Sequence, residues 1–152
     1  MDVLALYDAH KNMVYRLALS FLKSVPDAED AVQQVFLRLI EYRGRIVPGK
    51  ERQWLAAVTA NLCRDMLRAA TRRRTEPLTE DIVFETPEEN DVFRSVMELS
   101  AGERAAVYLY YYEGYSTAET AQILGLSQTA VTSRLDRARQ HLRGKLEEVR
   151  YG

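Results

Sequence analysis

Apolar residues recur at steps of three and four along most of this chain, which is the spacing of helices that each bury one face. No segment alternates apolar and polar residues as a strand does, so we predict an all-α fold. A first helix is expected to bury a face that comprises Tyr7, Val14, Leu17, Ala18 and Phe21. A second helix is expected to begin at Asp27, which caps it. Its buried stripe comprises Ala28, Ala31, Val32, Val35, Phe36, Leu39 and Ile40.

A third helix is predicted from about Arg52 to Arg72, after a loop from Arg43 to Glu51. Its expected buried stripe is Leu55, Val58, Leu62, Met66 and Ala69. On another face, the same spacing aligns Asn61, Arg64, Arg68 and Arg72. A line of guanidinium and amide groups suits contacts with phosphates and base edges. Trp54 is either a core anchor or a platform for an unstacked base, and the combination favours single-stranded nucleic acid.

The second half of the chain predicts a helix-turn-helix. Ser116 and Glu119 form a capping box for one helix, Gly125 supplies the turn with Leu126 in the core, and Ser127 caps the next helix. The buried face of that last helix is predicted to be Val131, Leu135, Ala138 and Leu142. In such a motif the second helix enters the major groove of a DNA duplex. A plain helical hairpin is the alternative.

The polar residues of this last helix divide into two expected groups. Base-edge contacts are expected from Gln128, Thr129, Thr132 and Ser133, which are short and polar. Phosphate contacts are expected from Arg134, Arg137, Arg139 and Arg143.

An aromatic helix precedes the helix-turn-helix. Ser100 and Glu103 form a second capping box, and the helix that they start is predicted to continue through Tyr112 and to end at Gly114. Its tyrosines occupy all faces of one turn: Tyr108, Tyr110, Tyr111 and Tyr112. They form either a surface for another protein or the aromatic filling of a small core.

Charge is segregated along the chain although the net charge is only −1. Residues 43–74 carry nine basic and two acidic side chains, and residues 76–98 carry one basic and eight acidic side chains. Residues 134–150 carry six basic and three acidic side chains. Each block alone is consistent with a solvent-exposed face. Taken together, the basic and acidic blocks form separate regions of positive and negative electrostatic potential, which suit polyanionic and basic partners respectively. The acidic segment Thr75–Asn90 contains Pro77 and Pro87, has no helical period and is predicted to be a linker.

The composition favours a non-enzymatic cytoplasmic protein. The chain has 152 residues with 47% hydrophobic and 28% charged residues, which suits one domain or two small ones. Its single cysteine, Cys63, excludes an internal disulfide, and His10 and His141 lack a second histidine at ligand spacing. No apolar run approaches the roughly 20 residues of a membrane span, and the N-terminus does not have the pattern of a secretory signal. We expect no catalytic residue, metal, cofactor or small-molecule substrate.

Three stretches of the chain together resemble extracytoplasmic-function (ECF) sigma factors of bacterial RNA polymerase. They are DAEDAVQQVFLRL (27–39), RQWLAAVTANLCRDMLR (52–68) and ELSAGERAAVYLYYYEGYSTAETAQILGLSQTAVTSRLDRARQHL (98–142). The resemblance spans almost the whole chain, and its three blocks in order are more specific than a helix-turn-helix alone. It implies a region-two-like domain at 1–74, an acidic linker at 75–90 and a region-four-like domain at 91–152.

The resemblance also implies a role for each group of polar residues. The second helix is expected to dock on core RNA polymerase through Asp30, Gln33, Gln34, Leu37 and Arg38. The melted minus-ten strand is expected to contact Lys50, Arg52, Trp54, Asn61, Arg64, Arg68 and Arg72. The duplex minus-thirty-five element is expected to contact Ser127, Gln128, Thr129, Thr132, Ser133, Arg134 and Arg137. The linker is expected to act as a nucleic-acid mimic, and an anti-sigma factor is the further expected partner and holds the chain inactive in the cytoplasm or at the membrane.

The chain departs from the family pattern in its last helix. Many family members carry Gly-Thr-Val-Lys-Ser-Arg where this chain has residues 129–134, TAVTSR. Thr132 therefore replaces a lysine and Asp136 adds a negative charge, which predicts weaker or different duplex recognition. Ala101 and Gly102 stand where proline is common, which loosens the start of one helix.

Two other functions remain open from the residues. The first is a free-standing dimeric helix-turn-helix regulator, which would leave the basic third helix unexplained. The second is an interaction protein that docks on polymerase or an adaptor without contacting DNA. We also expect the acidic linker to draw the two domains together in the free protein.

Overall fold

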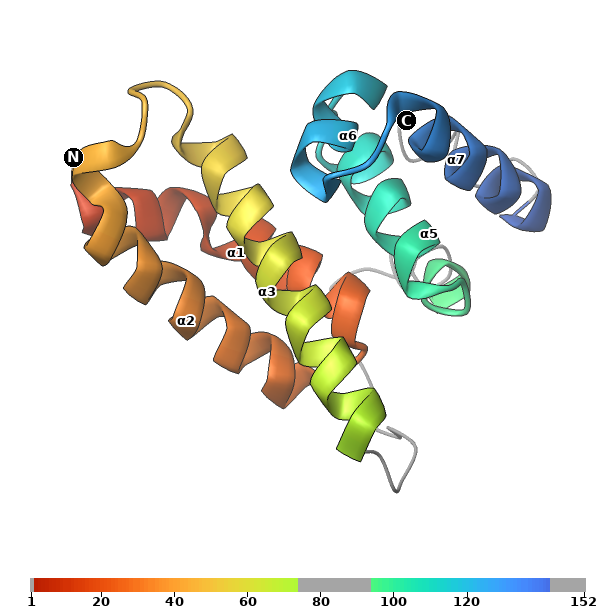
Figure 1. The fold of residues 1–152 in the computed structure, drawn as a ribbon, viewed down its shortest axis with the longest axis horizontal. Helices are drawn as coiled ribbons and strands as arrows, with labels where there is room; N and C mark the ends of the chain where they lie inside the picture. Colours follow the sequence, from red (N-terminus) through yellow and green to blue (C-terminus); the bar gives the residue numbers. More distant parts are fainter. Residues whose placement is uncertain (1, 74–93, 143–152) are drawn as a thin grey trace. The chain divides into compact units, whose positions relative to one another are not determined.

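The structure, a computed structural model, describes residues 2–73 and 94–142. These residues are helical or in short connections and contain no strand, which confirms the predicted all-α fold. The chain divides into two compact units, one in each half (Figure 1). None of the helices in the described ranges has the length and apolar character that a membrane span requires. The predicted linker, residues 75–90, lies outside the described residues, and so does the predicted closure of the domains through it.

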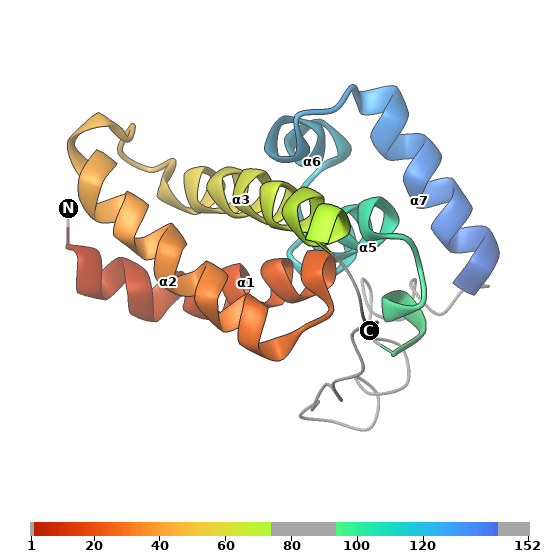
Figure 2. The ribbon, with the colours of Figure 1, turned by 60° about the horizontal axis from the view of Figure 1, so that its bottom comes forward.

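The first unit is a bundle of three helices, which are α1 (Val3–Leu22), α2 (Val25–Tyr42) and α3 (Glu51–Arg73). A short 3-10 turn, η1 (Arg43–Arg45), follows α2. All three helices contact one another, and Figures 1 and 2 show α1 beside both α2 and α3. They enclose a core whose fully buried side chains include Val14, Leu17, Val35, Leu39 and Leu55.

The predicted start of α2 at Asp27 is wrong. The N-cap is Ser24, whose Oγ accepts a hydrogen bond from the backbone N–H of Asp27 at 3.3 Å. Pro26 then lies in the first turn of the helix, where its missing N–H leaves no intrahelical hydrogen bond unmade. Lys23, in a left-handed conformation (φ 53°), ends α1 and turns the chain into this cap.

The predicted buried stripes are correct for most positions in α1 and α2 and wrong for several others. Tyr7 is 37% exposed and Ile40 is 48% exposed, while Val32 is half-buried. In α3 the predicted core residues Val58, Met66 and Ala69 are also only half-buried. The observed buried face of α3 is instead Leu55, Ala56, Thr59, Ala60, Leu62 and Cys63. The reason is that small side chains allow the helices to approach closely, so α3 is rotated toward its alanines.

The second unit contains α5 (Ala101–Val107), η2 (Tyr108–Tyr112), α6 (Thr117–Leu124) and α7 (Gln128–Leu142), preceded by a helical turn at residues 94–97. Helix α7 packs against both α5 and α6. All four predicted core residues of α7 are buried, which confirms its buried stripe. The unit therefore has its own hydrophobic core around α7.

The ends of both helices in the helix-turn-helix have the caps that the sequence predicts. Ser116 Oγ accepts from the N–H of Glu119 at 3.0 Å, and the Glu119 carboxylate accepts from the N–H of Ser116 at 2.9 Å, so the capping box is confirmed. Gly125 adopts the left-handed conformation (φ 66°) that ends α6. Ser127 Oγ accepts from the N–H of Ala130 at 3.1 Å and caps α7, whereas Leu126 is half-buried rather than in the core.

The aromatic helix continues through Tyr112 as predicted, but its last turn, η2, is a π-helix. At its start Ser100 Oγ accepts from the N–H of Glu103, and the Ser100 hydroxyl donates to the Glu103 carboxylate at 2.9 Å. The tyrosines mostly fill the core: Tyr108 and Tyr111 are buried. Two ring pairs stabilise this turn. The rings of Tyr108 and Tyr112 are stacked with centroids 5.8 Å apart, and those of Tyr110 and Tyr111 meet edge to face with centroids 5.0 Å apart. The core-filling alternative is therefore favoured, with Tyr110 and Tyr112 half-buried.

Candidate nucleic-acid and partner-binding surfaces

Helix α3 presents its polar line to solvent as the spacing predicted. Asn61 and Arg68 are exposed and Arg64 is half-buried, on the side of the helix away from the core. Arg64 Nη2 donates to Asn61 Oδ1 at 2.5 Å, and Arg68 forms an ion pair with Asp65 one turn earlier. Because Arg68 and Asp65 are both mostly exposed, their ion pair is weak and gives way easily to a phosphate. Arg72 lies in α3, but its side chain is outside the described residues.

The N-terminal end of α3 carries an aromatic cluster. Trp54 is half-buried, so it is neither a full core anchor nor a free platform. Its ring centroid lies 6.5 Å from that of Tyr42, and the Arg45 guanidinium lies 5.3 Å over the Tyr42 ring. Tyr42 is 42% exposed. The sequence interpretation missed Tyr42 and Arg45, although an aromatic residue just before a basic loop is a recognisable signal.

Two more predicted residues lie at this end of the helix. Lys50 is exposed and Arg52 is half-buried. The loop before them turns at Gly49 (φ 87°), and the N–H of Lys50 donates to the carbonyl of Val47 at 3.0 Å. The structure thus brings Lys50, Arg52 and Trp54 to the same end of the helix that carries the Asn61 line.

The N-terminal residues of α7 are available for contacts with bases. Gln128, Thr129 and Thr132 are exposed and Ser133 is half-buried. Gln128 Nε2 donates to Thr117 Oγ1 at 2.8 Å and ties α7 to the first turn of α6. Ser127 is exposed but its side chain caps the helix. These groups are therefore held in a fixed relation to one another.

The arginines of α7 do not share one surface. Arg137 is exposed, while Arg134 is half-buried with its guanidinium over Gly102. Arg139 Nε donates to Tyr111 Oη at 2.6 Å and its Nη1 to Asp136 at 2.9 Å. Burial opposes the charged form, but these hydrogen bonds raise the pKa of Arg139. Arg139 is thus engaged within its own unit, and its predicted phosphate contact stays a prediction, while Arg143 lies outside the described residues.

The outer face of α2 has the mixed character expected of a docking surface. Leu37 is 60% exposed, which agrees with its predicted place off the buried stripe. Asp30, Gln33 and Gln34 around it are exposed and Arg38 is half-buried. A single exposed leucine is common on protein surfaces and does not by itself identify a partner site.

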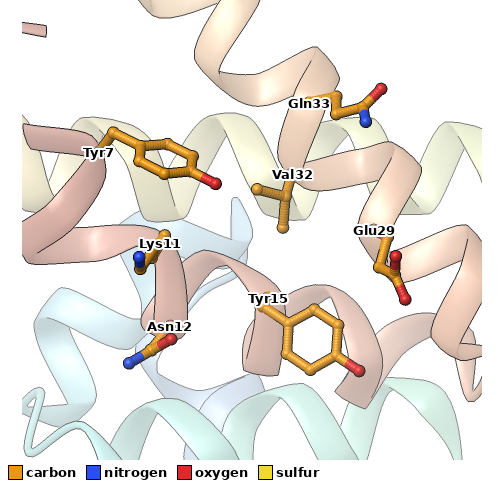
Figure 3. A pocket seen from close by; sticks show the side chains of 7 residues that line it. All are labelled: Tyr7, Lys11, Asn12, Tyr15, Glu29, Val32 and Gln33. Atoms are coloured by element: carbon orange, nitrogen blue, oxygen red, sulfur yellow. The ribbon is translucent and has the colours of Figure 1, made fainter. Parts of the chain in front are cut away.

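A shallow pocket of about 250 Å³ lies between α1 and α2, next to this face (Figure 3). It is lined by Tyr7, Lys11, Asn12, Tyr15, Glu29, Val32 and Gln33. Burial, and to a lesser extent the Glu29 carboxylate, raises the pKa of Tyr15. The described residues contain no group of histidine, cysteine and acidic side chains placed to hold a metal ion.

Comparisons with known proteins agree with this geometry. The family model described as Sigma-70 region 2 matches residues 6–73, and that described as Sigma-70, region 4 matches residues 90–142. The ECF RNA polymerase sigma factor SigL of Mycobacterium tuberculosis is 33% identical over 95% of this chain and 89% of its own length. SigE of Mycolicibacterium smegmatis is 35% identical over 90% of this chain, which spans 58% of that relative's length.

Two solved structures have the same fold. One is the sigma factor RpoE in complex with the anti-sigma factor NepR from Bartonella quintana, with a TM-score of 0.79 and 22% identity over 94% of this chain and 95% of that one. The other is CnrH in complex with the cytosolic domain of CnrY, with a TM-score of 0.67 and 28% identity over 96% of this chain and 88% of that one.

A capped helix-turn-helix in one unit and a helix with an exposed amide and arginine line in the other together define a DNA-binding protein of transcription. The sequence relatives make the class specific. The chain belongs to the ECF sigma factors of RNA polymerase. A free-standing dimeric regulator is not favoured, because the region 2 match covers the half of the chain that such a regulator would not need.

Proposed function

We propose that this chain binds core RNA polymerase and directs it to promoters through two DNA contacts. The region-two-like domain, residues 1–74, binds the single-stranded minus-ten element, and the region-four-like domain, residues 91–152, binds the duplex minus-thirty-five element. Residues 75–90 connect them as an acidic linker. The observation that carries this proposal is the line of Asn61, Arg64 and Arg68 on α3, of which Asn61 and Arg68 are exposed and Arg64 is half-buried, because a protein that reads only duplex DNA has no use for it.

Strand capture by α3 supplies the energy that opens the promoter. A base that leaves the duplex loses about 1.4 kcal/mol of stacking per step, while a base stacked on a protein aromatic gains roughly 1–3 kcal/mol. The half-buried Trp54 is the proposed stacking ring, and Lys50 and Arg52 at the same end of α3 are proposed to contact the phosphates. Arg72 is a further proposed phosphate contact. A few contacts of this size bias the equilibrium toward the melted strand. Polymerase carries out the chemistry, and the chain itself needs no cofactor or small-molecule substrate.

In this proposal the start of α7 recognises the duplex. Gln128, Thr129, Thr132 and Ser133 reach base edges in the major groove, while Ser127 and Arg137 are the candidates for backbone contacts. Arg134, the other residue predicted to contact this duplex, has its guanidinium over Gly102 instead. Thr132 Oγ1 already donates to the carbonyl of Gln128 at 3.0 Å, so this side chain is oriented before DNA binds.

In this proposal the outer face of α2 binds core polymerase. Leu37 provides an apolar anchor, and the polar groups around it, Asp30, Gln33, Gln34 and Arg38, set the orientation. An anti-sigma factor is the further proposed partner, because the similar structure of RpoE was solved in complex with the anti-sigma factor NepR. It holds the chain inactive in the cytoplasm or at the membrane.

Reconstituted transcription tests the proposal. Purified chain and core polymerase are incubated with a fragmented genomic template, and the 5′ ends of the transcripts are mapped. We expect new start sites that depend on the chain and share a sequence about one helical turn upstream. Failure of the chain to bind core polymerase would remove the proposal.

A variant separates DNA recognition from docking. The double substitution Asn61→Ala and Arg64→Ala is expected to abolish the chain-dependent start sites while polymerase binding persists. Asn12→Ala, which removes an exposed amide from α1, is the matched control. Retained initiation by the double variant would favour an interaction protein that does not contact DNA.

A further inference from the structure

The basic residues of α7 occupy three different sides of the helix. With about 100° per residue, Arg134 and Arg139 flank the buried stripe on opposite sides, and Arg137 lies on the outer face. Arg139 is held by Tyr111 and Asp136. Among the described residues, the outer side of α7 therefore carries the exposed Arg137 and the exposed Asp136, which point about 100° apart.

Arg134 lies against the first turn of α5. A β-carbon built on Gly102 would lie 2.6 Å from Arg134 Nη1, 2.9 Å from its Cζ and 3.5 Å from its Nε. The first two distances are shorter than van der Waals contact, so the guanidinium occupies the space that any other residue at position 102 would fill. The absence of a side chain at Gly102 is what makes this position of Arg134 accessible.

Two opposing charges act on this position. The first turn of a helix carries partial positive charge, which repels a guanidinium. The Glu103 carboxylate in the same turn accepts a hydrogen bond from the Ser100 hydroxyl but keeps its full negative charge, which attracts a guanidinium. The space over the bare glycine admits the guanidinium, and a β-carbon in that space displaces the end of this flexible side chain.

We propose that Gly102 is a specificity-determining residue, which withdraws the Arg134 guanidinium from promoter DNA by giving it a resting place on α5. This inference rests on the proposed function, in which α7 reads the minus-thirty-five duplex. The duplex contact then depends on Arg137 and on the polar side chains at the start of α7. Its dependence on salt is correspondingly low, and promoter choice rests more on the minus-ten strand.

The salt dependence of duplex binding tests this assignment, since each phosphate contact adds about 0.9 to the slope of log K against log salt concentration. The full chain and its variants are titrated with a mixed-sequence DNA duplex by fluorescence anisotropy at several salt concentrations. We expect Gly102→Ala to steepen the slope by about 0.9 and to tighten binding at low salt. We expect Arg134→Ala in the wild-type background to leave the slope unchanged.

The double variant separates charge from helix stability. Alanine is a better helix former than glycine by roughly 1 kcal/mol, so Gly102→Ala also stabilises α5. Gly102→Ala with Arg134→Ala has the same helix propensity without the guanidinium, and its slope is expected to return to the wild-type value. Arg134→Lys in the Gly102→Ala background is expected to keep the steeper slope, because it keeps the charge. Arg137→Ala is expected to lower the slope in either background.

Two results would overturn the assignment. One is a shallower slope for Arg134→Ala alone, because Arg134 would then contact DNA in the wild-type chain. The other is an unchanged slope for Gly102→Ala. Chain-dependent initiation with core polymerase tests the proposed function separately. A chain that shows the expected slopes but no initiation contradicts the proposed function and leaves the role of Gly102 standing.

Discussion

Helices α3 and α7 both carry arginines at helical spacing, but the two helices use them differently. In α3 the described polar line faces away from the core, and its internal partners, Asn61 with Arg64 and Asp65 with Arg68, are neighbours on the same exposed surface. In α7 two arginines turn back onto their own unit, one to Tyr111 and one over Gly102. Arginines at helical spacing therefore do not by themselves imply a surface for DNA.

The difference arises from what packs beside each helix. In α3 the partners described for Arg64 and Arg68 are Asn61 and Asp65, which lie on the same helix. Helix α7 lies against α5 and the tyrosine-rich η2, which offer a hydroxyl, aromatic rings and a bare glycine. The tertiary neighbours thus decide which arginines remain available to a ligand.

The largest expected effect concerns the inner face of α3. Burial raises the pKa of the Cys63 thiol from 9.0 to about 12. At pH 8 the folded chain therefore holds about 10³-fold less thiolate than the unfolded chain, and reaction with a thiol reagent slows accordingly. Because Cys63 is the only cysteine, the reaction rate with and without denaturant measures this directly. Equal rates would show that α3 does not pack as described.

The same group makes stability depend on pH in a defined direction. The folded pKa lies above the unfolded one, so the folded state binds the proton more tightly. The stabilisation from the neutral thiol is complete below about pH 9 and is lost as pH rises toward about 12. Cys63→Ala is expected to remove this component from the alkaline unfolding curve of the first unit.

The next effect concerns the outer face of α3. Asn61→Ala with Arg64→Ala is expected to reduce promoter opening by roughly 10- to 100-fold, since contacts with bases are worth about 1–3 kcal/mol. Permanganate reactivity of the minus-ten strand in the assembled holoenzyme measures the opening. The corresponding change in α7, Gln128→Ala with Thr129→Ala, is expected to impair duplex binding without weakening the binding of the holoenzyme to a pre-melted minus-ten template. Weaker binding of the α7 variant to a template that carries only the pre-melted minus-ten element would contradict this division.

A smaller effect tests how firmly α7 holds Arg139. Tyr111→Phe removes the hydroxyl that accepts from Arg139 at 2.6 Å. Because Arg139 is half-buried and regains water, we expect a loss of about 1 kcal/mol in the unfolding free energy of the second unit. Thermal or denaturant unfolding measures it. In an Arg139→Ala background the same substitution is expected to have little further effect, and full additivity of the two losses would show that the pair does not interact.

The smallest effect is expected at the exposed ion pair of α3. Asp65→Asn removes a surface partner of Arg68 and should change stability by no more than about 0.5 kcal/mol. It also removes a negative charge from the expected path of the strand, so binding of a single-stranded oligonucleotide should tighten about twofold at low salt. Asp136→Asn in α7 is the matched variant, and it is expected to cost more stability because Asp136 helps to hold Arg139. A larger loss for Asp65→Asn would reverse the comparison of the two helices.

The sequence by itself determined the helices and most of their ends. Periodicity identified the all-α fold, and the reciprocal cap of Ser116 and Glu119, the turn at Gly125 and the cap at Ser127 all follow from interactions between residues at most four apart. Such local interactions need no knowledge of distant neighbours. Helical periodicity also identified the polar line of α3 and the exposed Leu37 of α2.

Only the tertiary structure decided which face of α3 is inside and where the side chains of α7 point. The rotation of α3 toward Ala56 and Ala60 depends on how closely its partners approach, and the position of Arg134 depends on a glycine more than thirty residues away. Long arginine side chains choose among surroundings that periodicity does not specify, because several helices meet around them. The chemistry of each residue is local, whereas its availability to a partner is a property of the packed unit.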